Sequence, residues 1–352
     1  MAGAVEAEGW DGQVFMDSQS LGADPYVLMG AWAMATERIK LATGVTNPLS
    51  RHIAVTAGAA VTLQQISRGR AVLGIGRGDS ALAYLGYGPV SLTQFHRALT
   101  DLQTLLTGGE IAFEAQSSAP SIEALSLAHR PSGSRLKWLP ADLAKVPLDV
   151  AASGPRVIEM AALLAERATF SVGVMPERLQ WAVDIARAAR TRHALGESGI
   201  SYGAQVIVVC HPDREAMLPL AASFVAPLAR FQVIQGAAAG PTSAGDEADL
   251  AAVRSGYDMT KHDAIASHEK IVGTTLTRDF VQRFAIVGPP DHCIERLLQL
   301  RALGIDRFVV VGPGFHPEAT YDGGSLFARE VMPAIRQPAT YPPSTGRAVP
   351  VQ

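Results

Sequence analysis

The chain has 352 residues, 48% of them hydrophobic and 18% charged, which is enough apolar material for one large β/α-barrel domain or for two smaller domains. Its 30 basic and 33 acidic residues form no long run of one sign, so no nucleic-acid partner is expected. With two cysteines, no signal-peptide pattern and no long apolar stretch, the sequence excludes a disulfide scaffold and a membrane span and predicts a cytoplasmic protein.

Short apolar runs alternate with longer helical patterns along the chain. Several runs are apolar almost throughout, which is typical of strands buried on both faces of a parallel sheet. In chain order, strands are predicted at 13–16, 39–45, 71–75, 148–152, 169–174, 204–210 and 307–312. Helices are predicted at 25–36, 53–66, 92–106, 155–165, 176–195, 214–231 and 292–303. This repetition of strand and helix predicts a parallel sheet.

The seven predicted strand–helix units are one fewer than a TIM barrel contains. We therefore predict an α/β fold, a (β/α)8 TIM-type barrel with insertions, whose first strand is missing or is replaced by another segment. Residues 1–312 are expected to form this single domain, with insertions at 107–145 and 232–285. Such insertions form lids and substrate walls, or they are ordinary surface decoration. The proline-containing residues 313–352 predict an extended C-terminal tail.

The segment RGRAVLGIGRGDS, residues 68–80, carries the most informative local signal. A predicted buried strand runs directly into Gly76 and Gly78, which Asp79 follows. Glycines at a strand end let a flat or anionic ligand approach the backbone, because no Cβ intrudes. A dinucleotide fingerprint needs GxGxxG at the start of a helix, which this segment does not match. It indicates either a ligand-lined strand exit or an ordinary glycine-rich turn.

A second strand exit is LATGVTNPLSRH, residues 41–52. Small polar side chains at a strand exit suit hydrogen bonds to the heteroatoms of a ligand, and they equally suit an ordinary turn. The residues concerned are Gly44, Val45, Thr46 and Asn47.

A third exit is VAASGPRV, residues 150–157, where a predicted strand ends and a helix begins. Free N–H groups and the helix dipole at Ser153, Gly154 and Pro155 favour binding of a phosphate. Arg156 either adds positive charge to this site or is a solvated surface arginine.

The segment ATERIKLATGVTNPLSRHIAVTAGAAVTLQQISRGRAVLGIGRGDS resembles the luciferase-like flavin and deazaflavin oxidoreductase superfamily. Within it, the segment is most similar to the coenzyme F420-dependent branch typified by methylenetetrahydromethanopterin reductase. The AASGP loop and the closing segment VGPPDHCIERLLQLRALGIDRFVVV match the same family. The resemblance covers about residues 10–110, 146–230 and 285–312.

The resemblance implies a barrel enzyme that binds F420 at these three exits. In this branch a non-prolyl cis peptide bond backs the deazaflavin ring, and the matching bond joins Gly44 and Val45. Thr46 and Asn47 would contact the polar edge of the ring. The remaining cofactor-binding residues that the resemblance implies are Gly76, Gly78 and Asp79 along the cofactor, and Ser153, Gly154, Pro155 and Arg156 around its phosphate.

One position departs from the family pattern. Asp17 matches the acidic residue of an Asp–His pair, but Ser18 replaces the histidine, which acts as a proton shuttle in some relatives. The candidate catalytic proton donors are therefore Asp79 and Asp17. The alternative for each residue is a hydrogen-bonded carboxylate with a structural role only.

The function that the resemblance implies is hydride transfer between F420 and an unidentified small organic substrate. The alternatives are an FMN-dependent luciferase-like monooxygenase, or a barrel that binds a flavin without catalysis. The nine histidines show no metal-ligand spacing, so no metal is expected. Relatives are often oligomeric, so we expect a homodimer or a higher homo-oligomer.

Overall fold

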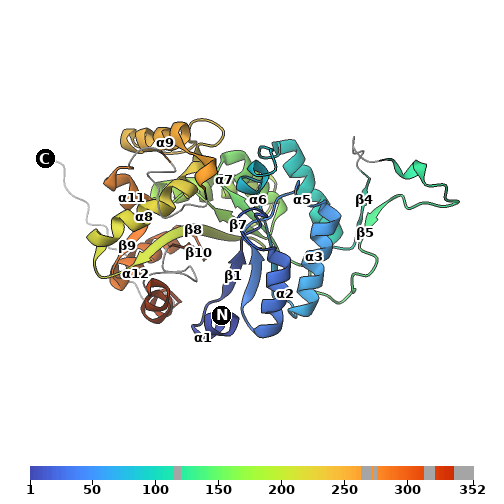
Figure 1. The fold of residues 1–352 in the computed structure, drawn as a ribbon, viewed down its shortest axis with the longest axis horizontal. Coiled ribbons are helices and arrows are strands. Elements are labelled where there is room, and N and C mark those ends of the chain that lie inside the picture. The colour runs from blue at the N-terminus through green and yellow to red at the C-terminus, as the bar shows by residue number, and fades with distance from the viewer. Residues whose placement is uncertain (114–119, 263–271, 273–275, 313–321, 337–352) are drawn as a thin grey trace.

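The computed structural model describes residues 1–113, 120–262, 272, 276–312 and 322–336. Its centre is a curled sheet of parallel strands surrounded by helices, which confirms the predicted α/β fold class (Figure 1). The sheet follows the order β1-β2-β3-β6-β7-β8-β10. These strands are β1 Gly12–Phe15, β2 Lys40–Thr43, β3 Ala71–Ile75, β6 Leu148–Ala152, β7 Arg167–Phe170, β8 Ser201–Cys210 and β10 Arg307–Val311.

The helices lie where the apolar periodicity places them, within a few residues at their ends. They include α2 Pro25–Ala35, α3 Ile53–Ile66, α5 Leu92–Leu106, α6 Pro155–Leu164, α7 Pro176–Arg192, α8 Arg214–Ala229 and α12 Pro290–Ala302. Pro155 and Pro176 occupy first turns, where a missing N–H costs nothing. Among the described residues, no helix is long and apolar enough to span a membrane.

The two predicted insertions contain helices and strands of their own. In the first, β4 Glu110–Ala112 pairs with β5 Gly133–Arg135 as an antiparallel arm that stands out from the body beside α3 (Figure 1). The second contains α9 Ala244–Gly256 and α11 Arg278–Phe284, and it is followed by the short strand β9 Ile286–Gly288. This strand pairs with the end of β8 and has only three residues, too few to show a period.

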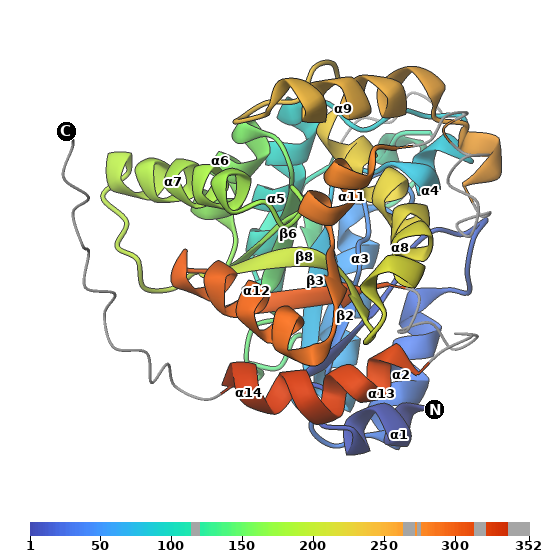
Figure 2. The same cartoon turned by 90° about the vertical axis from the view of Figure 1, so that its left-hand side faces the viewer.

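A C-terminal helical segment lies between α12 and the N-terminal helix α1, Ala2–Ala7 (Figure 2). It comprises α13 Gly323–Leu326, the π-helical turn η5 Phe327–Val331 and α14 Met332–Arg336. Phe327 stacks on Trp10, just before β1, with ring centroids 5.7 Å apart. The prediction of an extended tail is therefore wrong for residues 323–336, because buried apolar side chains hold them as helix. The rest of that predicted tail, after 336 and at 313–321, lies outside the described residues.

A charged network joins the N-terminal ends of three strands, opposite the strand exits. Arg307 opens β10, and its Nη1 lies 3.0 Å from Asp149 Oδ2 on β6. Its Nε donates to Ser201 Oγ on β8 at 2.6 Å. A Cβ on Gly203 would lie 2.9 Å from the guanidinium carbon, so only glycine leaves room for this side chain. Residues at the N-terminal ends of barrel strands usually contribute to stability rather than to catalysis.

Replacing Arg307 with methionine is expected to lower the free energy of unfolding by about 2 kcal/mol, because a half-satisfied carboxylate then stays buried. Urea denaturation measures this change. The matched control is Arg192→Met, which breaks an exposed pair with Glu159 and should cost less than about 1 kcal/mol. An equal loss of unfolding free energy in the two variants would contradict the stabilising role of Arg307.

Candidate functional site

The three predicted strand exits meet at one edge of the sheet. β2, β3 and β6 are neighbours, so their carboxyl ends lie together. A Cβ on Gly78 would lie 3.3 Å from Asn47 Cβ, and a Cβ on Gly76 would lie 4.0 Å from Ala151 Cβ. The exit loops are therefore in contact, and the structure brings the predicted glycines and polar residues into one place.

The peptide bond between Gly44 and Val45 is cis, as the resemblance predicted. The Val45 side chain is 37% exposed, and its γ-methyl groups face Gly74 and Gly76 on β3 and its exit. A Cβ on Gly74 would lie 2.0 Å from the Thr43 carbonyl oxygen. β2 and β3 approach each other this closely only because position 74 has no side chain. Gly74 was not among the predicted site residues.

Thr46 and Asn47 are both buried, and their backbone and side-chain polar groups differ in how they are paired. The backbone of Thr46 pairs with β3, through its N–H to the Gly74 carbonyl and its carbonyl to the Gly76 N–H, both at 2.9 Å. Asn47 Oδ1 accepts from two amides of its own turn. Among the described residues, neither Thr46 Oγ1 nor Asn47 Nδ2 has a partner at hydrogen-bond distance, although the Tyr26 hydroxyl lies near enough to interact with Thr46. Because buried polar atoms are almost always hydrogen-bonded, these two atoms indicate a place for a ligand or water.

Asp17 is bound by an arginine that sequence reasoning missed. Arg51 Nη1 lies 2.6 Å from Asp17 Oδ2, and its Nη2 lies 2.6 Å from Asp24. The guanidinium also lies over the ring of Tyr26, 5.1 Å from its centroid. Burial and the charge of Asp17 raise the pKa of Tyr26 above its usual range. Ser18, at the position of the family's histidine, has a buried hydroxyl for which the described residues offer no hydrogen-bond partner.

Asp79 is bound in the same way by Arg230, which lies 151 residues away in the chain. Both carboxylate oxygens of Asp79 accept from the guanidinium, and Arg230 itself is only 5% exposed. Burial alone lowers the pKa of Arg230, but the hydrogen bonds and charge of Asp79 outweigh it and raise that pKa. Both oxygens of Asp79 are thus held in place by one guanidinium group, a bidentate arrangement that fixes the orientation of the carboxyl group.

Arg230 connects Asp79 to the second insertion. Its guanidinium carbon lies 4.7 Å from the centroid of the Tyr257 ring. The Tyr257 hydroxyl is 2.5 Å from His262 Nδ1, and burial raises the pKa of Tyr257 to about 12. The insertion is thus joined to the loop after β3 through side chains that no local motif signals.

The third exit carries positive charge at the start of α6. Ser153 Oγ donates to the Phe231 carbonyl at 3.0 Å, and no side chain caps the N-terminus of α6 at Gly154. Pro155 fills the first helical position, and Arg156 is exposed. Arg77, from the exit of β3, lies close enough that burial and the charge of Arg156 lower its pKa.

Neither Arg77 nor Arg156 forms an ion pair with a carboxylate in the described part of the chain, whereas Arg51 and Arg230 do. Like charges placed together at a helix N-terminus repel, and an anion between them relieves the repulsion. Arg77 donates its Nε–H to the Val90 carbonyl, which fixes it at this edge. Sequence reasoning missed Arg77, although it stands within the glycine-rich motif.

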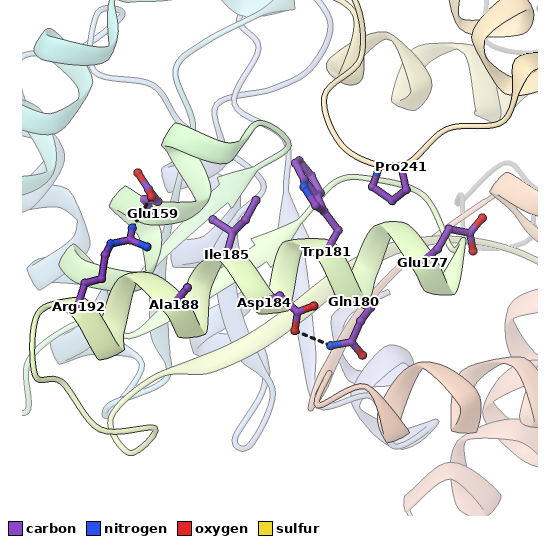
Figure 3. Close-up of a pocket in the computed structure, with 9 residues that line it drawn as sticks. All are labelled: Glu159, Glu177, Gln180, Trp181, Asp184, Ile185, Ala188, Arg192 and Pro241. Atoms are coloured by element: carbon purple, nitrogen blue, oxygen red, sulfur yellow. Dashed lines mark hydrogen bonds and ion pairs between the residues drawn. The ribbon is translucent and has the colours of Figure 1, made fainter.

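A pocket of about 700 Å³ on the outer side of α7 is a separate feature (Figure 3). Trp181 and Ile185 point into it from α7, and Pro241 closes one side. None of the predicted site residues lines it. This pocket therefore lies apart from the strand exits.

Comparison with known proteins places this fold. Residues 1–307 match the family of luciferase-like monooxygenases. The 5,10-methylenetetrahydromethanopterin reductase of Methanolobus tindarius is 24% identical over 314 residues, which cover 88% of each chain.

Two solved structures share the fold. The coenzyme F420 dependent tetrahydromethanopterin reductase from Methanopyrus kandleri matches with a TM-score of 0.69 and 21% identity, covering 94% of this chain and 93% of that one. The oxygenating constituent of 3,6-diketocamphane monooxygenase of Pseudomonas putida, solved with FMN, matches with a TM-score of 0.61 and 17% identity, covering 96% and 92%. With a family match over most of its length and the barrel fold of these enzymes, the chain belongs to the luciferase-like monooxygenase family.

Proposed function

We propose that this chain is an oxidoreductase that holds coenzyme F420 at the exits of β2, β3 and β6 and transfers hydride between it and a small organic substrate. One observation carries the proposal. The half-exposed Val45 lies against Gly76, and beside it two buried polar atoms, Thr46 Oγ1 and Asn47 Nδ2, have no partner at hydrogen-bond distance in the part of the chain that the structure describes. This arrangement fits a flat ring with a hydrogen-bonding edge. The F420 relatives support the choice of ring.

Each part of the site has a proposed task toward this cofactor. Val45 and the glycines at 44, 76 and 78 form the platform for the ring, and Thr46 and Asn47 bind its polar edge. Ser153, Gly154 and Pro155 present the N-terminus of α6 to the phosphate, with Arg156 and Arg77 neutralising its charge. Bound F420 would supply the carbon that accepts or releases hydride. The protein supplies orientation and a proton acceptor.

Asp79 is our first candidate for that acceptor. As a carboxylate held by Arg230, it takes a proton during substrate oxidation and returns it during reduction. Asp17, held by Arg51, is the second candidate. The cytoplasmic location and the homo-oligomeric state stay predictions.

An FMN-dependent monooxygenase is the second candidate function. The family match and the FMN-bound relative favour it. The same positive charge at the start of α6 suits the phosphate of FMN, so the phosphate site does not distinguish the two cofactors.

Titration of the purified protein with F420 and with FMN separates these functions. We expect F420 to bind with a Kd at least tenfold lower, about 1.4 kcal/mol, measured by fluorescence. Tight binding of FMN without binding of F420 would favour the monooxygenase. Failure to bind either cofactor would contradict both functions.

The phosphate site is tested by Arg77→Gln and Arg156→Gln. Each change is expected to weaken F420 binding about tenfold and to reduce its dependence on salt, because a charge-assisted hydrogen bond contributes about 1.5 kcal/mol. Arg192→Gln, an exposed arginine on α7, is the matched control and should leave affinity unchanged. Affinity insensitive to both site variants would place the phosphate elsewhere.

The Asp79–Arg230 pair is tested by a double-mutant cycle in urea. Asp79→Asn alone is expected to lower the free energy of unfolding by about 3 kcal/mol, since it leaves a buried guanidinium uncompensated. Combined with Arg230→Met, it should reveal a coupling of about 2 kcal/mol. The control cycle uses Arg278→Met and Glu215→Gln, an exposed pair with an expected coupling below about 1 kcal/mol. A coupling energy as small as that of the control cycle would contradict a stabilising ion pair between Asp79 and Arg230.

A further inference from the structure

The pocket on the outer side of α7 has the size of a small-molecule site. Its volume is about 700 Å³, and ligand pockets usually measure roughly 300–1,000 Å³. Its apolar floor consists of Trp181, Ile185 and Ala188, whose spacing puts them on one side of α7. Figure 3 shows Trp181 and Ile185 pointing the same way, with Pro241 beside the indole ring. The pocket therefore offers an apolar floor and one wall to a ligand.

The wall of the pocket is held in place by the protein itself. A Cβ on Gly240 would lie 2.8 Å from two carbons of the Trp181 indole, so only glycine lets this loop lie against the ring. Arg178, which is 1% exposed, donates from its two Nη atoms to the carbonyl oxygens of Ala239 and Pro241 at 2.9 and 2.8 Å. Its guanidinium carbon lies 5.9 Å from the centroid of the Trp181 ring. The indole and the loop are therefore fixed before a ligand binds.

The charged groups of the pocket leave one carboxylate without a cation. Glu159 on α6 pairs with Arg192 at 2.5 Å. Glu177 pairs at 2.9 Å with Arg283, which is not part of the lining. The third carboxylate of the lining, Asp184, forms no ion pair within the residues that the structure describes. The pocket thus carries a negative charge that a ligand with a single positive charge would balance.

Asp184 is positioned to bind an ammonium group. Gln180 Nε2 donates to Asp184 Oδ1 at 2.7 Å, which orients the carboxylate (Figure 3). Asp184 Oδ2 and the Gln180 carbonyl oxygen are further acceptors, and an ammonium group supplies N–H donors for such oxygens. Asp184 follows Trp181 by three positions, and side chains at this spacing are neighbours on a helix. A cation held by Asp184 is therefore close to the indole, whose π-system attracts positive charge.

We propose that this pocket binds a small organic cation, a protonated primary amine attached to an apolar or aromatic body. The ammonium group binds Asp184 and Gln180, and the body of the ligand packs on Trp181 and Ile185. A neutral ligand of the same shape leaves the charge of Asp184 unbalanced, and an anion is repelled by it. None of the residues at the strand exits lines this pocket, so the inference goes beyond the proposed function and does not depend on F420.

Isothermal titration calorimetry of the full chain with probes of similar shape tests this site. We expect 2-phenylethylammonium to bind with a Kd about fivefold lower than that of 2-phenylethanol, and phenylacetate to show no binding. The preference is modest because Asp184 is exposed to solvent. Nα-acetyl-lysine amide carries the ammonium group without an aromatic body, and its Kd should be about fivefold higher than that of 2-phenylethylammonium. Tighter binding of the lysine probe would instead indicate a lysine side chain of another protein, and would overturn the proposal of a small amine.

Two substitutions separate the charge of the pocket from its apolar floor. Asp184→Asn is expected to abolish the preference for the ammonium probe over the alcohol, because it removes the charge and keeps the shape. Trp181→Ala should weaken binding of both probes about tenfold, since it removes the aromatic floor. The matched controls are Asp142→Asn, an exposed carboxylate, and Trp138→Ala, a half-exposed tryptophan, which lie outside the pocket and should leave both affinities unchanged.

Thermal melting checks that each variant is folded, because Trp181 packs against Gly240. Asp184→Asn changes an exposed side chain, so it tests the site even if Trp181→Ala does not fold. A wild type that binds the ammonium probe no better than the alcohol, or a preference that survives Asp184→Asn, would overturn the inference. Affinity that a folded Trp181→Ala variant retains in full would also overturn it.

Discussion

The close approach of β2 and β3 at their carboxyl ends is the constraint on which the rest of the site depends. The Thr43 carbonyl oxygen occupies the space that a side chain at position 74 would need. With glycine there, Thr46 pairs with the backbone on both sides of Ile75, and Val45 turns its side chain outward over the strand exit. The backbone of Thr46 is satisfied by β3, and its buried hydroxyl has no partner at hydrogen-bond distance among the described residues. The close approach of β2 and β3 thus determines where Val45 lies and places the side chain of Thr46 beside it.

Arginines determine the electrostatics around that platform. Arg51 and Arg230 each bind one of the two carboxyl groups that the sequence offers as catalysts, so both groups are held in fixed positions. Within the described ranges of the chain, Arg77 and Arg156 have no carboxylate partner of this kind, and they leave a positive site at the start of α6. The proposed enzyme therefore has its negative groups neutralised by the protein and its positive groups reserved for an anion.

Local patterns were sufficient for much of this fold. Buried runs such as Ala71–Ile75 have the length and composition of parallel strands, and the motif around Gly44 identified the cis bond through the family resemblance. The strand Ile286–Gly288 was missed because three residues carry no period. The C-terminal helix was missed because the prolines after it dominate the composition of the predicted tail.

The side chains that complete the site were harder to predict, for a different physical reason. Arg230 meets Asp79 across 151 residues, and nothing in the sequence near either one records the contact. Arg77 stands inside a recognised motif, but its proximity to Arg156 depends on the packing of β3 against β6. Ion pairs between distant segments follow from the assembly of the curled sheet, so they become visible only when the strands are in register.

A crystal structure of the chain with F420 is the most direct test of the proposed cofactor site. We predict that the ring lies on Val45 and Gly76, with its polar edge at Thr46 Oγ1 and Asn47 Nδ2. The phosphate is expected between the start of α6 and the guanidinium groups of Arg77 and Arg156. A complex in which F420 occupies another surface, or in which its ring contacts none of these residues, would contradict the proposed site.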